Sequence, residues 1–314
     1  GHPGAAMGMA DIAAELYGSH LKFCASDPNW HDRDRVVLSN GHAAIFLYSL
    51  LWLTGIPGIT LEDLKSFRMA GSITPGHPEY GHTPGVETTT GPLGQGLGMA
   101  VGFAMAERRL RDEFGSDICN HRTWVFAGDG CLMEGVGQEA VSLAGHLGLG
   151  HLTLLYDMNG ITIDGRTDLA FTEDTAGKFK ALGWHVQEAC GHTPSEISEV
   201  LAAAKRETSR PSIILFRTTI GKGAPTKAGT SSIHGSKLGK QEAAETKKLL
   251  GLPEGRFEVD DCCLNAWRQF GTRCEPEMQA WQQNLKALSQ AKKEEYHRRQ
   301  SGQLPEGLNE AISI

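Results

Sequence analysis

The sequence lacks several features that would place a protein in a class at once. No apolar run approaches ~18 residues, since the longest candidate, 43–53, is interrupted by polar side chains, so no transmembrane helix is expected. A charged segment followed by an apolar, cleavable one is missing at the start. Lys and Arg number 30 against 37 Asp and Glu, and the net charge of −7 argues against a nucleic-acid-binding surface.

The cysteine pattern and the lack of a dinucleotide-binding motif disfavour two further classes of protein. The seven cysteines are odd in number and lack metal-ligand spacing, which fits a reducing cytoplasm better than a disulfide framework. No Gly-x-Gly-x-x-Gly follows a first strand with an acid about 20 residues later, so a Rossmann dehydrogenase is disfavoured. With 40% hydrophobic and 21% charged residues, the 314-residue chain has the composition of a globular protein.

Strand-type and helix-type segments alternate through the middle of the chain. Apolar strand patterns occupy 124–127, 152–156, 185–189 and 212–219, and helical patterns occupy 137–146, 172–182 and 194–207. This order predicts an α/β fold with a parallel sheet flanked by helices and right-handed crossovers. We expect one α/β domain over 1–255 and a helical extension over 256–314.

Outside this region the pattern is helical or irregular. A short helix with a capping box is predicted over 60–68, with Thr60 as N-cap. Polar helices are predicted at 240–250 and, as one long element, at 276–299, with an irregular stretch between them.

Polar side chains follow two of the predicted strands. Asp129 stands in Gly128-Asp129-Gly130 directly after the first strand, and Asn159 follows the strand 152–156. Neighbouring parallel strands would bring both side chains to the edge where α/β folds place their ligands. Carboxylate, amide and carbonyl oxygens suit Mg²⁺ or Ca²⁺, and the glycines allow a phosphate to approach the backbone. A divalent ion with a pyrophosphate is the predicted ligand.

The motif Gly128-Asp129-Gly130 with Asn159 resembles the thiamine-diphosphate motif. Beyond this motif, the sequence resembles the transketolase family. Four further segments carry this likeness. They are Gly1-His2-Pro3-Gly4, the stretch 34–42, Pro75-Gly76-His77-Pro78-Glu79, and the stretch 89–96. The likeness runs from residue 1 to about 235 and resumes at 299–305, as the cofactor-diphosphate half of that family.

The resemblance implies a thiamine diphosphate site with Mg²⁺, for which Ca²⁺ or Mn²⁺ could substitute. Its metal ligands would be Asp129, Asn159 and the main-chain carbonyl of Ile161. The implied cofactor-binding residues are His42, Gly91, Leu93, Gly128, Asp129, Glu134, Asn159 and His234. The implied catalytic residues are His2, His77 and His234, because protons must move near neutral pH, where imidazole titrates. Glu134 and Glu139 would also join a carboxylate network across a dimer interface.

The implied reaction moves a two-carbon ketol unit from a ketose phosphate to an aldose phosphate. In the family, a second α/β domain holds the pyrimidine end of the cofactor and the sugar phosphate, and this sequence does not contain it. We therefore expect a partner half or separate subunit, in a homodimer or heterotetramer. A dihydroxyacetone synthase differs mainly in its acceptor and stays open as an alternative, as does a non-catalytic module that keeps only the fold.

Overall fold

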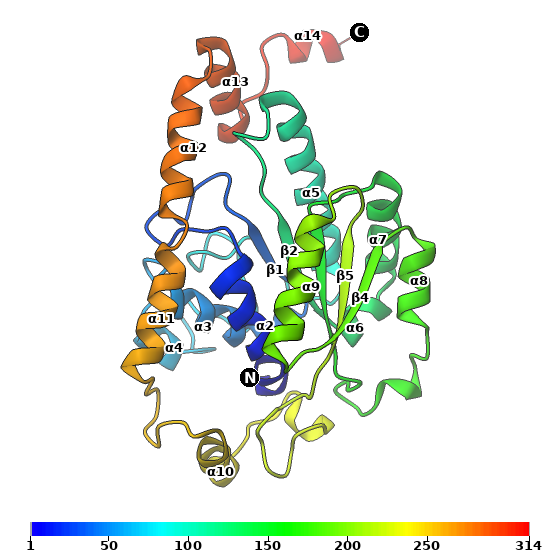
Figure 1. Cartoon of the computed structure of the whole chain (residues 1–314), viewed down its shortest axis with the longest axis vertical. Helices are drawn as coiled ribbons and strands as arrows, with labels where there is room; N and C mark the ends of the chain where they lie inside the picture. Colours follow the sequence, from blue (N-terminus) through cyan, green and yellow to red (C-terminus); the bar gives the residue numbers. More distant parts are fainter. Residues whose placement is uncertain (1, 314) are drawn as a thin grey trace.

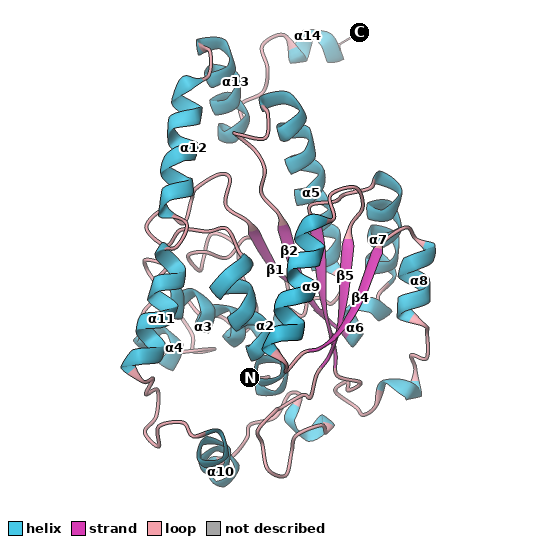
Figure 2. Cartoon of the chain, in the orientation of Figure 1, coloured by secondary structure: helices cyan, strands magenta, loops and turns pink. Residues whose placement is uncertain are grey.

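A five-stranded parallel sheet forms the centre of the molecule, in a computed structural model that describes residues 2–313. The strand order is β1-β2-β3-β5-β4, and every neighbouring pair is parallel. The strands are β1 (Arg35–Leu38), β2 (Thr123–Gly128), β3 (Leu152–Met158), β4 (His185–Cys190) and β5 (Ser212–Arg217). Figure 2 shows this sheet between layers of helices, which confirms the predicted α/β architecture.

Both faces of the sheet are buried by helices. Trp124 and Phe126 of β2 point into a core shared with α2 (Ala10–Glu15), α3 (Ala44–Thr54) and α9 (Pro194–Arg206). Val125 and Ala127 point to the other face, into a core shared with α5 (Gln95–Phe114), α7 (Gly135–Leu147) and α8 (Thr175–Ala181). Strands covered on both sides carry apolar residues at consecutive positions, which is why these runs could be recognised.

The remaining elements are short or lie at the ends of the molecule. They are α1 (Pro3–Gly8), a π-helical turn η1 (Leu16–His20), α4 (Leu61–Lys65), α6 (Asp129–Met133), α10 (Lys240–Leu250), α14 (Leu308–Ile312), and the 3-10 turns η2 (Gly41–Ala43), η3 (Thr167–Leu169) and η4 (Ser231–Ile233). The predicted capping box is confirmed, because the Thr60 hydroxyl accepts from the Asp63 backbone and the Asp63 carboxylate accepts from the Thr60 backbone. No helix within residues 2–313 is long and apolar enough to cross a bilayer.

The C-terminal region differs from its prediction. The single helix expected over 276–299 is two helices, α12 (Glu275–Ala287) and α13 (Gln290–Ser301), because Leu288 is extended and Ser289 caps the second helix. The stretch expected to be irregular contains α11 (Asp261–Thr272). Trp281 of α12 is buried and its indole N–H donates to the Ile118 carbonyl at 2.9 Å. The extension therefore packs onto the α/β domain, while the boundary at 255 stays a prediction.

The two ends of the sheet are occupied differently. In Figure 1 the N-terminus and the segment between β5 and α10 lie together at the lower end, whereas α12 and α13 rise at the upper end. Gly4 is part of the lower end, where its carbonyl accepts from the Gly221 backbone at 2.8 Å. The loops that follow the strands and the first residues of the chain are thereby brought to one place.

Candidate functional site

A cavity of about 500 Å³ lies at the carboxyl edge of the sheet, where β2 and β3 end side by side with Gly128 paired to Asp157. All eleven site residues expected from the sequence line it. They are His2, His42, His77, Gly91, Leu93, Gly128, Asp129, Glu134, Asn159, Ile161 and His234. Residues from seven separate segments of the chain thus converge on one cavity.

The Asp129 carboxylate joins the ends of the two central strands. It is buried, and it accepts hydrogen bonds from the Tyr156 hydroxyl at 2.6 Å and the Gly160 backbone N–H at 3.1 Å. Burial raises the pKa of Asp129, and the two hydrogen bonds oppose this only in part. None of the ion pairs found within residues 2–313 includes Asp129. A bound cation would supply the positive partner that this buried carboxylate lacks.

The Asn159 amide is held in one orientation beside it. Its Nδ2 donates to the Asp157 carboxylate at 2.9 Å, and its Oδ1 accepts from the Ile161 backbone at 3.0 Å. Asp157 also accepts from the Thr218 hydroxyl, and burial raises the pKa of Asp157 to about 7. Because the amide nitrogen faces Asp157, the amide oxygen faces the loop 159–161. Asp129, Asn159 and the Ile161 carbonyl form an all-oxygen donor set that fits Mg²⁺.

Three imidazoles form a cluster against the same cavity. The ring centroids lie 4.9 Å apart for His2 and His42, 5.1 Å for His42 and His234, and 5.7 Å for His2 and His234. Burial, with a smaller contribution from His234, lowers the pKa of His2 to about 4 and that of His42 to about 3. These two rings are therefore neutral near pH 7, and each offers one N–H donor and one acceptor nitrogen.

Several polar atoms around the cavity have no partner within the described part of the chain. The buried Nδ1 atoms of His2 and His234 and the buried Oδ1 of Asn40 make no hydrogen bond there. Buried polar atoms are nearly always hydrogen-bonded, so orphaned atoms grouped around one cavity indicate a polar ligand.

His77 and the loop of Gly91 form a further wall. A Cβ at Gly91 would lie 3.2 Å from Cγ of His77, and the backbone there has φ of 154°, so a glycine is needed for the close approach. The Tyr48 hydroxyl donates to the His77 carbonyl at 2.9 Å, which fixes the position of this segment. Its neighbour His82 bonds to the Ser72 carbonyl instead and does not line the cavity.

Two residues of the site were given no role from the sequence. Asn40 lies inside the stretch 34–42 that carries part of the family likeness, yet only its burial in the cavity wall shows that it is available to a ligand. In the sequence, Tyr156 has the pattern of an apolar strand residue. Its hydroxyl donates to Asp129 only because the two strands are paired.

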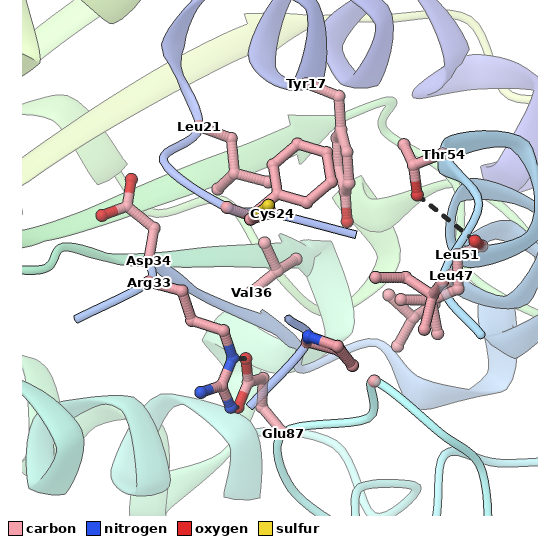
Figure 3. A pocket seen from close by; sticks show the side chains of 14 residues that line it. Tyr17, Leu21, Cys24, Arg33, Asp34, Val36, Leu47, Leu51, Thr54 and Glu87 are labelled. Atoms are coloured by element: carbon pink, nitrogen blue, oxygen red, sulfur yellow. Dashed lines mark hydrogen bonds and ion pairs between the residues drawn. The ribbon is translucent and has the colours of Figure 1, made fainter. Parts of the chain in front are cut away.

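A second cavity, of about 40 Å³, lies between η1, β1 and α3 and shares no lining residue with the first. Figure 3 shows the Arg33 guanidinium facing the Glu87 carboxylate in its wall, with the shorter of two contacts at 2.7 Å. Because these charges satisfy each other and the other walls are mainly apolar, this cavity offers no converging reactive groups.

Comparisons with known proteins agree with the geometry. Residues 1–305 match the family described as "Transketolase, thiamine diphosphate binding domain". Transketolase 2 of Escherichia coli is 51% identical over 314 residues, covering 97% of this chain and 46% of that protein. The solved transketolase of Leishmania mexicana superposes with a TM-score of 0.95 at 45% identity, covering 98% of this chain and 47% of the other.

A transketolase of Pichia stipitis solved in complex with sedoheptulose-7-phosphate superposes with a TM-score of 0.92 at 41% identity, covering 98% of this chain and 46% of the other. The chain therefore spans about half the length of the relatives it matches.

Proposed function

The chain belongs to the transketolase family, and we propose that it is the half of a transketolase that holds the diphosphate end of thiamine diphosphate and a divalent ion. The observation that supports this most is the convergence of Asp129, Asn159 and the histidines on one cavity. The proposed reaction transfers a two-carbon ketol unit from a ketose phosphate to an aldose phosphate. When bound, the cofactor would supply the nucleophilic carbon that accepts this unit.

Asp129, Asn159 and the Ile161 carbonyl are the proposed ligands of Mg²⁺. Asp157 orients the Asn159 amide, and Tyr156 and the Gly160 backbone orient the Asp129 carboxylate, so the donor oxygens are held before the ion arrives. The Gly128 backbone, His42, Leu93, Gly91 and Glu134 complete the proposed contacts to the cofactor.

His2, His77 and His234 are the proposed groups that bind the sugar and move its protons. They lie on the cavity wall in three separate segments, and the orphaned nitrogens of His2 and His234 are free to bond to substrate hydroxyls. Neutral imidazole can donate a proton and accept one, as transfer between two hydroxyls requires.

The sugar phosphate group is proposed to bind outside this half. Among residues 2–313, no Lys or Arg lines the cavity, although phosphate recognition normally uses cationic side chains. A second, pyrimidine-binding half, in the same polypeptide or as a separate subunit, would supply those cations and complete the site. The Pichia relative bound to a sugar phosphate supports this substrate class.

A symmetric assembly is proposed in addition. The packed helices α5 and α7 leave four apolar side chains exposed, Met99, Met105, Val136 and Leu143. Glu134 and Glu139 are also exposed on this part of the molecule. Such a mixture of exposed apolar groups and acids suits contact with a second copy, in which the carboxylates would meet across the interface.

The seven cysteines are unpaired, which fits a reducing cytoplasm.

Ketol transfer is the activity to measure, with a ketose phosphate donor, an aldose phosphate acceptor, Mg²⁺ and thiamine diphosphate. We expect turnover only when the chain is combined with the pyrimidine-binding half. Turnover by the chain alone would refute the need for that half. Absence of metal-dependent cofactor binding by the combined halves would refute the proposed function and favour a non-catalytic module.

A further inference from the structure

Two adjacent cysteines, Cys262 and Cys263, lie in the first turn of α11, and neither lines the cavity of the proposed active site. Both are exposed, and their Sγ atoms are 4.0 Å apart. Cys24, Cys119, Cys131 and Cys274 are buried and Cys190 is half-buried, so this pair holds the only exposed thiols among the seven.

The backbone keeps the two sulfurs from bonding to each other. A disulfide needs sulfurs about 2.05 Å apart, so the pair would have to close by almost half its separation. The turn is closed by the Leu264 backbone N–H, which donates to the Asp260 carbonyl at 2.9 Å. The following turn of α11 is fixed, since Arg268 donates to the Trp52 carbonyl at 2.6 Å and Trp267 packs on the core. Closing the disulfide would therefore require the first turn to open.

The same spacing suits two sulfurs that share one ion. Thiolates bound at about 2.3 Å in tetrahedral geometry lie roughly 3.8 Å apart, and the smaller S–As–S angle of pyramidal trivalent arsenic brings them somewhat closer. The observed separation of 4.0 Å exceeds both spacings by amounts that side-chain torsions can absorb without moving the helix. We infer that Cys262 and Cys263 form a two-sulfur chelating site for a soft, thiophilic centre, with trivalent arsenic as the representative ligand.

The chemistry of binding balances without an oxidant. With phenylarsine oxide, the As=O bond is replaced by two As–S bonds, and the two thiol protons leave with the oxygen as one water molecule. Arsenic stays trivalent and no disulfide forms. Glutathione can offer only one sulfur at a time, so the pair gains from the second, intramolecular contact. The site would thus stay loaded in a reducing compartment that keeps its thiols free.

Phenylarsine oxide itself is the probe. The protein is mixed with one equivalent, and bound arsenic is measured by native mass spectrometry while glutathione or a dithiol is added as competitor. We expect one arsenic per chain, resistant to glutathione and removed by the dithiol. Cys262→Ser and Cys263→Ser should each weaken retention against glutathione by roughly 10²-fold or more. Cys190→Ser is the matched control and should bind as the unmodified protein does.

Two results would overturn the inference. One is retention of arsenic against glutathione in either single variant, which would place the site elsewhere. The other is equal removal by glutathione and the dithiol in the unmodified protein, which would mean that only one sulfur is bound. The variants are checked by circular dichroism, since both side chains are exposed and their replacement should leave the helix content unchanged.

Discussion

Replacing Asp129 by asparagine should remove metal-dependent cofactor binding while keeping the shape of the site. The side chain is buried, and Asp129→Asn exchanges its charge for a neutral amide of the same size. Removing one partner of a buried charge pair costs about 3–5 kcal/mol. At about 1.4 kcal/mol per factor of ten, this corresponds to a loss of roughly 10²–10⁴-fold in Mg²⁺ affinity.

Isothermal calorimetry measures this loss, with thiamine diphosphate titrated into the chain and its pyrimidine-binding half at several Mg²⁺ concentrations. Asp164→Asn is the matched control, because Asp164 lines the same cavity but is exposed and makes no contact with Asp129 or Asn159 among the hydrogen bonds of residues 2–313. We expect Asp164→Asn to bind normally. Wild-type affinity in Asp129→Asn would remove Asp129 from the metal site.

Three further predictions test neighbouring parts of the site. His77→Ala should raise the KM for the donor or lower kcat while leaving cofactor affinity within about twofold, because a residue that contacts the sugar does not hold the cofactor. A large loss of cofactor affinity in calorimetry would mean that His77 binds the cofactor. Asp157→Ala should lower Mg²⁺ affinity by about 10–100-fold, less than Asp129→Asn, since it orients the Asn159 amide without binding the ion; an unchanged Mg²⁺ titration would contradict this role. His42 has a folded-state pKa of about 3 against 6.5 when unfolded, so the unfolded chain binds more protons between these values and the free energy of unfolding should fall as pH drops through this window. Urea midpoints measured across this range should depend less on pH in His42→Asn, and an equal slope in both proteins would show that His42 is not kept neutral by the fold.

The position of the candidate site could be predicted because two of its residues stand next to recognisable local patterns. Asp129 and Asn159 follow apolar strands, and the rule that parallel strands end at one edge of the sheet predicts that they lie together, as the pairing of β2 with β3 shows. His2, His77 and His234 have no such local signal, and they were expected in the site only through the resemblance. Tertiary structure brings them within reach of one another.

What the sequence did not reveal depends on contacts between distant segments. The strand β1 has only four residues between polar neighbours, and it becomes a strand by pairing with β2. The break between α12 and α13 lies at Ser289, whose hydroxyl caps α13, and Trp281 and Tyr296 on either side of the break are buried in one apolar cluster with residues of the domain. The position of Asn40 is of the same kind, since only the folded structure shows that its buried oxygen lacks a partner within residues 2–313 and faces the cavity wall.

Anomalous diffraction from crystals of the complete enzyme grown with Mn²⁺ and thiamine diphosphate tests the central claim most directly. The account predicts one manganese peak, bound by the side-chain oxygens of Asp129 and Asn159, the carbonyl of Ile161 and the diphosphate. A diphosphate bound without manganese at these residues, or a peak that contacts neither side chain, would contradict it.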